Sequence, residues 1–257
     1  MKIGKYTIDL SINRYFLPGA LSPWHWRGMQ IDIEPKSAIA HTIRRTGGFE
    51  EAEIEIAAAL YAVRYSGRHI VDVGANIGLH SLAWSKLAPV LSVEPAPATY
   101  ARLTANVAAN QLHDRIRTVR TAVSDTVGEV EFFVAKDSAF SSMKDTRRRE
   151  IADRVVVPCT TLDKLAAELP PVGLVKIDVE GFERAVIAGA AGLLRRDQPV
   201  LFVEIYGGTD SNPDPEGTVE DIRSYGYDPF VYVRDVGLLP YERHRDDRQN
   251  YFFIPAR

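Results

Sequence analysis

The chain of 257 residues has a single cysteine, no long apolar run and no large excess of charge of either sign. Because Cys159 stands alone, no disulfide can form within the chain, which favours a reducing compartment. No stretch approaches the roughly 20 apolar residues of a membrane-spanning helix, and the start, MKIGKYTIDL, lacks the apolar core of a signal peptide. We therefore expect a cytoplasmic protein without a membrane span.

The formal net charge of −3 provides no general attraction toward nucleic acid, so we expect no nucleic-acid partner. Hydrophobic residues make up 46% of the chain and charged residues 25%, as in an ordinary globular protein. A chain of this length can build one large domain with a full apolar core.

From residue 69 onward, short apolar runs alternate with segments of helical character. Nearly continuous apolar runs are typical of strands that are buried on both faces, and their alternation with helices predicts a mostly parallel sheet. Two strands close to the C-terminus suit an antiparallel edge. The predicted strands cover residues 69–74, 90–95, 116–123, 128–134, 154–157, 174–181, 199–207, 228–233 and 250–255.

Residues 49–65 predict a helix with acidic residues in its first turn. Ile54, Ala58, Tyr61 and Val63 are its candidate inward positions. We place a domain boundary before this helix, so that residues 49–257 form the main domain.

Residues 1–48 then form an N-terminal extension, which includes the irregular segment LPGALSPWHWRGMQ. Two interpretations of the extension remain open. It contributes to a substrate-binding lid, or it forms an oligomer contact in which Trp24 and Trp26 are buried against a partner chain, as in a homodimer.

The segment VDVGANIG crosses from the first core strand to a helix and contains Asp72, Gly74, Asn76 and Gly78. Glycine at two of these positions removes the Cβ atoms that would block a cofactor lying against the strand end. The free N–H groups at the start of the helix favour an anionic group such as a carboxylate. Asp72 ends the strand, where it acts around the cofactor's amino-acid portion or caps the turn.

Glu94 ends the second core strand, 22 residues after Asp72. An acid at this place in α/β nucleotide sites accepts hydrogen bonds from ribose hydroxyls. Ser124 and Asp125 follow the third strand, where an adenine ring would lie. Glu50 precedes the first core strand and either folds over the cofactor or stabilises the helix N-terminus.

A nicotinamide dinucleotide site is the main rival interpretation. Its fingerprint GxGxxG accommodates a pyrophosphate, but the segment GANIG has no third glycine in register. The Asp72 carboxylate also suits a cationic cofactor better than an anionic one. These residues favour a sulfonium cofactor.

Taken together, VDVGANIGLHSL, VEPAPATYARLTANVAAN, AVSD, TTLDKL, VKIDVEGFE and NYFFIP resemble the FkbM family of methyltransferases in order and spacing. The resemblance extends over about four fifths of the chain, from Phe49 to Pro255. It implies S-adenosylmethionine as cofactor and a class I methyltransferase fold, which is a Rossmann-like three-layer sandwich with a seven-stranded, mostly parallel sheet. It also implies methyl transfer to an oxygen, often a hydroxyl of a sugar, a polysaccharide or a related natural product.

Methyl transfer from a sulfonium is an in-line displacement, and a hydroxyl acceptor must also lose a proton. Asp178 and Glu180 end the fourth strand and Glu204 ends the fifth, so these carboxylates are candidates for the general base. They are also the candidate ligands of a Mg²⁺ ion that would acidify the acceptor. As alternatives, they cap the next helix or pair with Lys176, Arg184 or Arg223. His80, after the glycine turn, is a further candidate base.

Three functions therefore compete. The first is an O-methyltransferase whose acceptor is a small molecule or a glycan. The second is a nicotinamide-dependent oxidoreductase, which has no evident Tyr-x-x-x-Lys pair. The third is a cofactor-binding module without transfer activity in a biosynthetic complex, against which Asp72, Glu94 and Asp178 argue.

Overall fold

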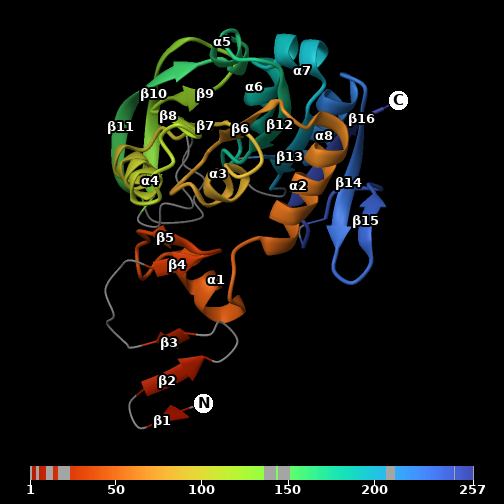
Figure 1. The fold of residues 1–257 in the computed structure, drawn as a ribbon. Coiled ribbons are helices and arrows are strands. Elements are labelled where there is room, and N and C mark those ends of the chain that lie inside the picture. The colour runs from red at the N-terminus through yellow and green to blue at the C-terminus, as the bar shows by residue number, and fades with distance from the viewer. Residues whose placement is uncertain are drawn as a thin grey trace.

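The computed structural model describes residues 2–3, 6–9, 14–16, 24–135, 143, 151–206, 212–245 and 247–256. Over these residues the chain forms a three-layer α/β sandwich around one large sheet (Figure 1). None of the described helices combines the length and the apolar character needed to cross a membrane.

The central sheet has eight strands in the order β15-β14-β16-β13-β12-β6-β7-β8. The five strands from β13 to β8 are parallel, whereas β16 pairs antiparallel with both β13 and β14. In chain order the strands are β6 (His69–Val73), β7 (Val90–Val93), β8 (Ile116–Val119), β12 (Val172–Ile177), β13 (Val200–Glu204), β14 (Tyr227–Val233), β15 (Gly237–Pro240) and β16 (Asn250–Pro255).

The prediction of seven strands is wrong by one, because β15 adds an eighth strand at the edge. β15 has only four residues, begins with Gly237 and ends with Pro240, and therefore lacks an alternating apolar pattern. It forms because the chain reverses after β14, with Asp235 in the left-handed region at φ 64°. The predicted antiparallel final strand is confirmed, although β16 lies inside the sheet between β13 and β14.

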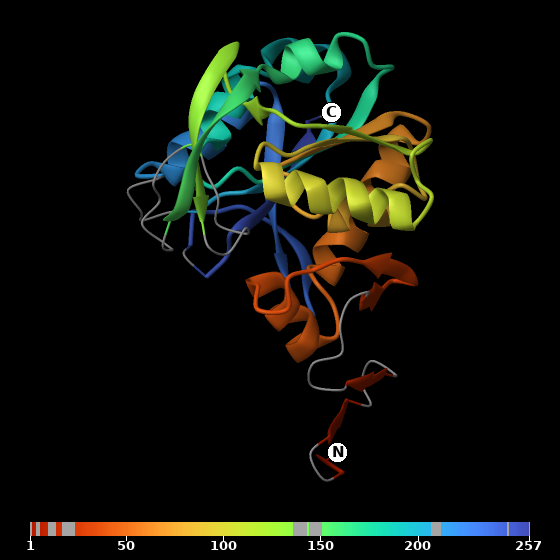
Figure 2. The same cartoon turned by 90° about the vertical axis from the view of Figure 1, so that its left-hand side faces the viewer.

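Successive residues of each parallel strand point to opposite faces of the sheet, as the strand geometry requires. Ile70 packs on one face with α2, α3 and α4, whereas Val71 packs on the other face with α5 to α8 (Figures 1 and 2). The helices are α2 (Glu51–Tyr65), α3 (Leu79–Trp84), α4 (Pro97–Ala109), α5 (Leu162–Ala166), α6 (Glu183–Ala188), α7 (Ala191–Asp197) and α8 (Pro215–Arg223).

A smaller sheet lies beside the carboxyl end of β8. It contains β9 (Ala122–Val123), β10 (Gly128–Ala135) and β11 (Ile151–Thr160) in the order β10-β11-β9. The predicted strand 116–123 is therefore divided, because the chain leaves the central sheet after β8 and pairs with β11.

Helix α2 confirms the predicted helix, but one of its inward positions is wrong. Ile54 and Tyr61 are buried together with Ala57, which are three positions on one helical stripe. Val63 is 86% exposed because it lies outside that stripe.

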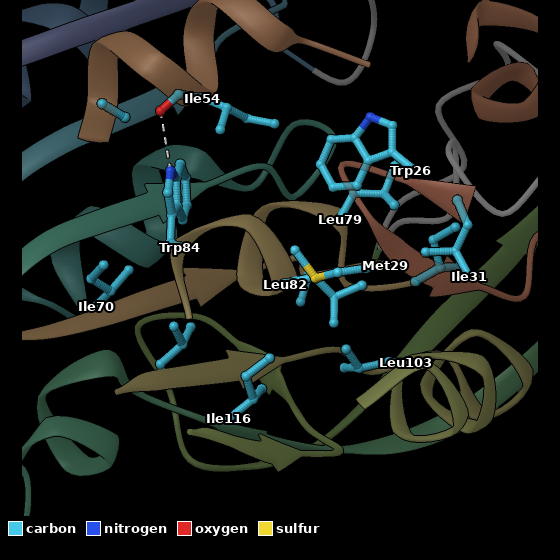
Figure 3. Packing of buried hydrophobic residues seen from close by; sticks show 14 of the residues in the cluster. Trp26, Met29, Ile31, Ile54, Ile70, Leu79, Leu82, Trp84, Leu103 and Ile116 are labelled. Atoms are coloured by element: carbon cyan, nitrogen blue, oxygen red, sulfur yellow. Dashed lines mark hydrogen bonds between the residues drawn. The ribbon is translucent and has the colours of Figure 1, made fainter. Parts of the chain in front are cut away.

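The N-terminal segment from residue 24 packs into the central core. It contains β4 (Trp24–Trp26), β5 (Met29–Ile31) and α1 (Ala38–Thr46), and β1 (Lys2–Ile3), β2 (Tyr6–Asp9) and β3 (Arg14–Phe16) precede it as a separate antiparallel sheet. Trp26, Met29 and Ile31 belong to the same apolar cluster as Leu82 of α3 (Figure 3). Residues 26–43 therefore share the core of the main domain, and no break in packing marks the predicted boundary at residue 48.

We predict that Trp26→Ala lowers the free energy of unfolding by about 3–5 kcal/mol, because it removes a large side chain that is 3% exposed. Trp26 Nε1 also donates a 2.7 Å hydrogen bond to Glu51 Oε1 across the predicted boundary. The measurement is urea unfolding. Trp24→Ala is the control, since Trp24 is only partly buried, and we expect a loss of about 1 kcal/mol. A loss for Trp26→Ala as small as that expected for Trp24→Ala would show that the segment is not part of the core.

Candidate active site

A cleft with two adjoining pockets opens at the carboxyl ends of β6, β7, β12 and β13, which is where open α/β sheets place their ligands. The two pockets share Gly74, Asn76, Asp178 and Glu180. The first pocket, of about 530 Å³, is also lined by Val73, Val93, Glu94, Pro95, Thr121, Ala122, Val123, Phe132, Met143 and Val179.

The second pocket, of about 700 Å³, is called the acidic pocket below, because four carboxylates line it. They are Glu50, Asp178, Glu180 and Glu204. Its other lining residues are Ala38, Ile39, Thr42, Phe49, Gly74, Ala75, Asn76, Ile77, Leu79, His80, Lys176 and Tyr206.

Gly74 brings the ends of β6 and β12 together. Its φ is +76°, and a Cβ atom added there would lie 1.8 Å from the carbonyl oxygen of Asp178. Gly78 has φ +92°, and its added Cβ would meet Leu103 Cδ1 at 2.5 Å. The glycines are thus required by contacts within the protein. Gly74 lines both pockets, whereas Gly78 lines neither, so the structure gives no support to the prediction that Gly78 clears space for a cofactor, and for Gly74 it stays a prediction.

Glu94 lies at the end of β7 with its carboxylate in the first pocket and 6% exposed. Its two oxygens accept the backbone N–H groups of Asn76 at 3.0 Å and Ala96 at 2.9 Å. Burial raises the pKa of this carboxyl to about 7. Asn76 itself has φ 51°, a left-handed conformation that asparagine tolerates, and this conformation points its N–H toward Glu94.

Asp72 is fully buried and lines neither pocket. Its Oδ2 accepts a 2.5 Å hydrogen bond from Ser81 Oγ, and Ser81 in turn contacts Ser92. Its Oδ1 lies 3.9 Å from Lys176 Nζ. The structure thus places Asp72 beneath the cleft, which does not support direct contact with the cofactor, and action through water or a role in the turn stays open.

Ser124 and Asp125 also lie outside both linings. Ser124 Oγ donates to Asp125 Oδ1 at 3.1 Å. Thr121, Ala122 and Val123, which immediately precede them, line the first pocket instead. The structure therefore gives no support to the prediction that the Ser124 or Asp125 side chain contacts an adenine ring.

Lys176 of β12 is 3% exposed, yet its pKa is raised above its usual range. Burial alone would lower this pKa, but the carboxylates of Asp178, Asp72, Glu50 and Glu204 together outweigh burial. Its Nζ lies 3.1 Å from Asp178 Oδ2. The ion pair with Lys176, one of the alternatives left open by the sequence, is thus present for Asp178.

The other two proposed cationic partners are engaged elsewhere. Arg184 pairs with Asp214 and Asp221, and Arg223 pairs with Glu220.

Glu204 faces the acidic pocket from the end of β13. Its pKa is raised well above the usual range by burial and by the neighbouring charges of Asp178, Glu50 and Glu180. Glu180, at φ 54°, follows β12 in a left-handed turn and is 6% exposed. The structure therefore brings the three predicted carboxylates to one pocket.

The predicted Mg²⁺ site gains no support. Within the part of the chain that the structure describes, no group of three or more His, Cys, Asp or Glu side chains is arranged to bind a metal ion. Asp178, one of the three candidate ligands, is already paired with Lys176 at 3.1 Å.

His80 and Glu50 meet at the edge of the acidic pocket. His80 Nε2 lies 3.0 Å from Glu50 Oε2, and His80 is only 5% exposed. The rings of Phe49, Trp84 and Phe202 surround the imidazole. Both side chains line the acidic pocket, and Glu50 is the more exposed of the two.

Sequence reasoning missed Glu183, which is 1% exposed. Its Oε1 accepts the N–H of Gly181 at 2.8 Å, so it supports the turn that carries Asp178 and Glu180. Burial raises the pKa of Glu183 to about 7. In the sequence, the signal for this supporting role was an acidic residue at a helix start, Glu183, two residues after Gly181.

The model of the FkbM methyltransferase domain matches residues 72–229 of the chain. Hexuronic acid methyltransferase AglP of Haloferax volcanii is 30% identical over 139 residues, which cover 54% of this chain and 56% of AglP. Methyltransferase sdnD of Sordaria araneosa is 29% identical over 193 residues, which cover 61% of this chain and 73% of sdnD. The match thus spans little more than half of AglP.

Among solved structures, the FkbM methyltransferase from Methylobacillus flagellatus KT aligns with a TM-score of 0.50 at 16% identity. The alignment covers 79% of this chain and 50% of that chain. This likeness confirms the predicted class I methyltransferase fold.

We predict that Lys176→Met lowers the free energy of unfolding by about 3–5 kcal/mol, because it leaves buried Asp72 without a cation. The raised pKa of Lys176 means that its contribution is fully present below the usual lysine pKa and is lost only at strongly alkaline pH, so urea unfolding at pH 7 measures it. The double variant Asp72→Asn/Lys176→Met should lose less than the two single variants together. Strict additivity would refute the coupling.

Proposed function

Because the chain belongs to the FkbM family of methyltransferase domains, we propose that it is an S-adenosylmethionine-dependent O-methyltransferase. Its acceptor is a hydroxyl group on a sugar, a glycan or a related natural product. AglP, by its name, acts on a hexuronic acid, which supports an acceptor of the carbohydrate class.

The observation that carries this proposal is the charge of the cleft. Four carboxylates line the acidic pocket, and Lys176 is the only lysine or arginine among the described residues that line it. Lys176 is already paired with Asp178. A buried excess of negative charge is stabilised by a cationic ligand, and S-adenosylmethionine carries a sulfonium and an ammonium group.

The same charge argues against a nicotinamide dinucleotide. Its pyrophosphate is anionic and would approach the turn at Gly74, beside Asp178 and Glu180. The described lining offers no free cation to compensate it. The absence of the third glycine in the turn agrees with this argument.

The first pocket fits the nucleoside part of the cofactor. Glu94 has both oxygens at the end of β7, where they can accept ribose hydroxyls in addition to the two backbone N–H groups. Phe132 and Val123 provide apolar walls for an adenine ring, and Thr121 lies beside them. Gly74 and Asn76 then lead from this pocket into the acidic pocket.

S-adenosylmethionine supplies the methyl electrophile when it is bound. The chain has to orient the acceptor hydroxyl and remove its proton, and we assign the proton to a carboxylate oxygen of Glu204. Its raised pKa makes Glu204 a stronger base than an ordinary carboxylate. Asp178 is the weaker candidate, because its carboxylate is already engaged by Lys176 Nζ at 3.1 Å.

We assign the acceptor wall to the N-terminal segment. Ala38, Ile39 and Thr42 of α1 line the acidic pocket and do not line the first pocket. Tyr206, which hydrogen-bonds to Glu204, lies on the same pocket. Residues before position 49 therefore contribute to acceptor binding, in agreement with the lid interpretation of the extension.

We predict that the purified protein binds S-adenosylhomocysteine saturably and does not bind NADH, because the acidic cleft repels a pyrophosphate. Isothermal titration calorimetry with both ligands measures this directly. Asp178→Asn should weaken the binding of S-adenosylhomocysteine. Asp228→Asn, at an exposed position of β14, should leave this binding unchanged. Binding of NADH alone would refute the proposed function.

We predict that Glu204→Gln lowers kcat by at least about 100-fold, because a neutral amide cannot accept the hydroxyl proton. The acceptor for this assay is first found by screening glycans with methyl-labelled cofactor. The wild-type kcat should rise with pH as Glu204 ionises, since its pKa is raised, and this limb should be absent in the variant. Glu220→Gln, on the surface of α8, is the matched control. An unchanged kcat in Glu204→Gln would eliminate Glu204 as the base.

A further inference from the structure

Glu50 has a strained backbone conformation at the edge of the acidic pocket. It precedes helix α2 with φ 47° and ψ 39°, in the left-handed region that residues with a side chain rarely adopt. Its carboxylate makes no capping hydrogen bond to the helix that follows. The helix N-terminus therefore does not explain the position of the Glu50 side chain, which lines the acidic pocket. Such strain is maintained only where the surroundings impose it, and it is concentrated at functional sites.

Two side chains from distant parts of the sequence orient the Glu50 carboxylate. His80 of α3 places Nε2 3.0 Å from Glu50 Oε2, and Asn250 of β16 donates from Nδ2 to Glu50 Oε1 at 3.5 Å. The imidazole is itself fixed by Phe49, Trp84 and Phe202, whose ring centroids lie 5.2–6.1 Å away. Each carboxylate oxygen thus has one side-chain partner.

The partly buried carboxylate also favours its ionised form. Burial would raise the pKa of Glu50, but His80, Lys176 and Asn250 together lower it. Lys176 is closer to Asp178, at 3.1 Å, and is not among the ion pairs of Glu50. The acidic pocket therefore presents an oriented carboxylate whose charge is not matched by a neighbouring lysine or arginine in the described part of the chain.

We propose that Glu50 binds the ammonium group at the amino-acid end of the methyl donor, and that His80 and Asn250 are positioning residues that act through Glu50. This inference rests on the proposed function. It revises the interpretation of His80 as a base, because the imidazole Nε2 already contacts Glu50 Oε2.

The position of Glu50 favours the donor's ammonium over a group of the acceptor. His80, which contacts Glu50, is two residues after Gly78 and belongs to the helix that follows the glycine turn. Ala75, Ile77 and Leu79 of this same turn and helix line the acidic pocket. Gly74 and Asn76 line both pockets and connect the first pocket to the acidic pocket at this turn. A ligand whose nucleoside lies beside Glu94 would therefore extend its amino-acid end toward Glu50.

The test compares two ligands that share the nucleoside and differ in the amino-acid end. S-adenosylhomocysteine carries the ammonium group, whereas 5′-methylthioadenosine lacks the whole amino-acid portion. Dissociation constants for both are measured by calorimetry on the full chain. Glu50→Gln should weaken binding of S-adenosylhomocysteine by about 10- to 100-fold and change binding of 5′-methylthioadenosine by less than about 3-fold.

The positioning role is tested at His80 by two variants. His80→Leu cannot donate a hydrogen bond and should reduce the preference for S-adenosylhomocysteine by about 10-fold. His80→Gln retains an N–H donor and should restore most of that preference. Glu53→Gln is the matched control, since Glu53 lies in the first turn of α2 but outside the pocket lining.

The outcomes separate this inference from the proposed function. If the wild-type protein binds neither nucleoside, the proposed function is wrong. If both ligands bind and Glu50→Gln weakens them equally, or weakens neither, the ammonium assignment is wrong while the proposed function stands. If His80→Leu weakens both ligands equally and His80→Gln restores nothing, His80 has only a structural role. Melting temperatures of all variants identify any that fail to fold.

Discussion

The cleft depends on the close approach of β6 and β12 at their carboxyl ends. Gly74 permits this approach, because any Cβ atom there would overlap the carbonyl oxygen of Asp178. Lys176 lies between Asp72 and Asp178 and neutralises part of the charge that the approach concentrates. Without the lysine, the fully buried carboxylate of Asp72 would lack a compensating cation, which is costly in a medium of low dielectric constant. The geometry of the shared wall of both pockets therefore follows from one glycine and one cation.

The parallel strands and their order along the chain could be predicted, because buried strands such as β6 and β12 appear in the sequence as nearly continuous apolar runs. The position of β15 could not, since its pairing depends on a reversal after β14 and not on a pattern within its own four residues. The packing of residues 26–43 into the core could not be predicted from the sequence either. Trp26 and Ile31 lie in very short strands, too short for a periodic signal, and the partners that bury them are far along the chain.

The candidate site could likewise be predicted only in part. Glu94, Asp178, Glu180 and Glu204 could be placed in the cleft, because each follows directly from the end of a parallel strand. Asp72 ends such a strand too, yet its side chain points into the protein, toward Ser81 and Lys176. Position at a strand end therefore predicts which residues are near the cleft. It does not predict on which side of the strand each carboxylate lies, because that depends on the alternation of side chains and on the partners available beneath the sheet.

The distribution of pKa values separates the carboxylates of the cleft by task. Lys176 lies next to Asp178. His80 and Asn250 contact Glu50, and together with the charge of Lys176 they lower its pKa, although burial would raise it. Glu204 has no such cation at contact distance among the described residues, and its neighbours raise its pKa. A carboxylate with a lowered pKa suits the binding of a cationic group, whereas one with a raised pKa suits proton removal. The arrangement of cationic and neutral partners around these acids therefore distinguishes a donor-binding residue from a base, although both are glutamates in the same pocket.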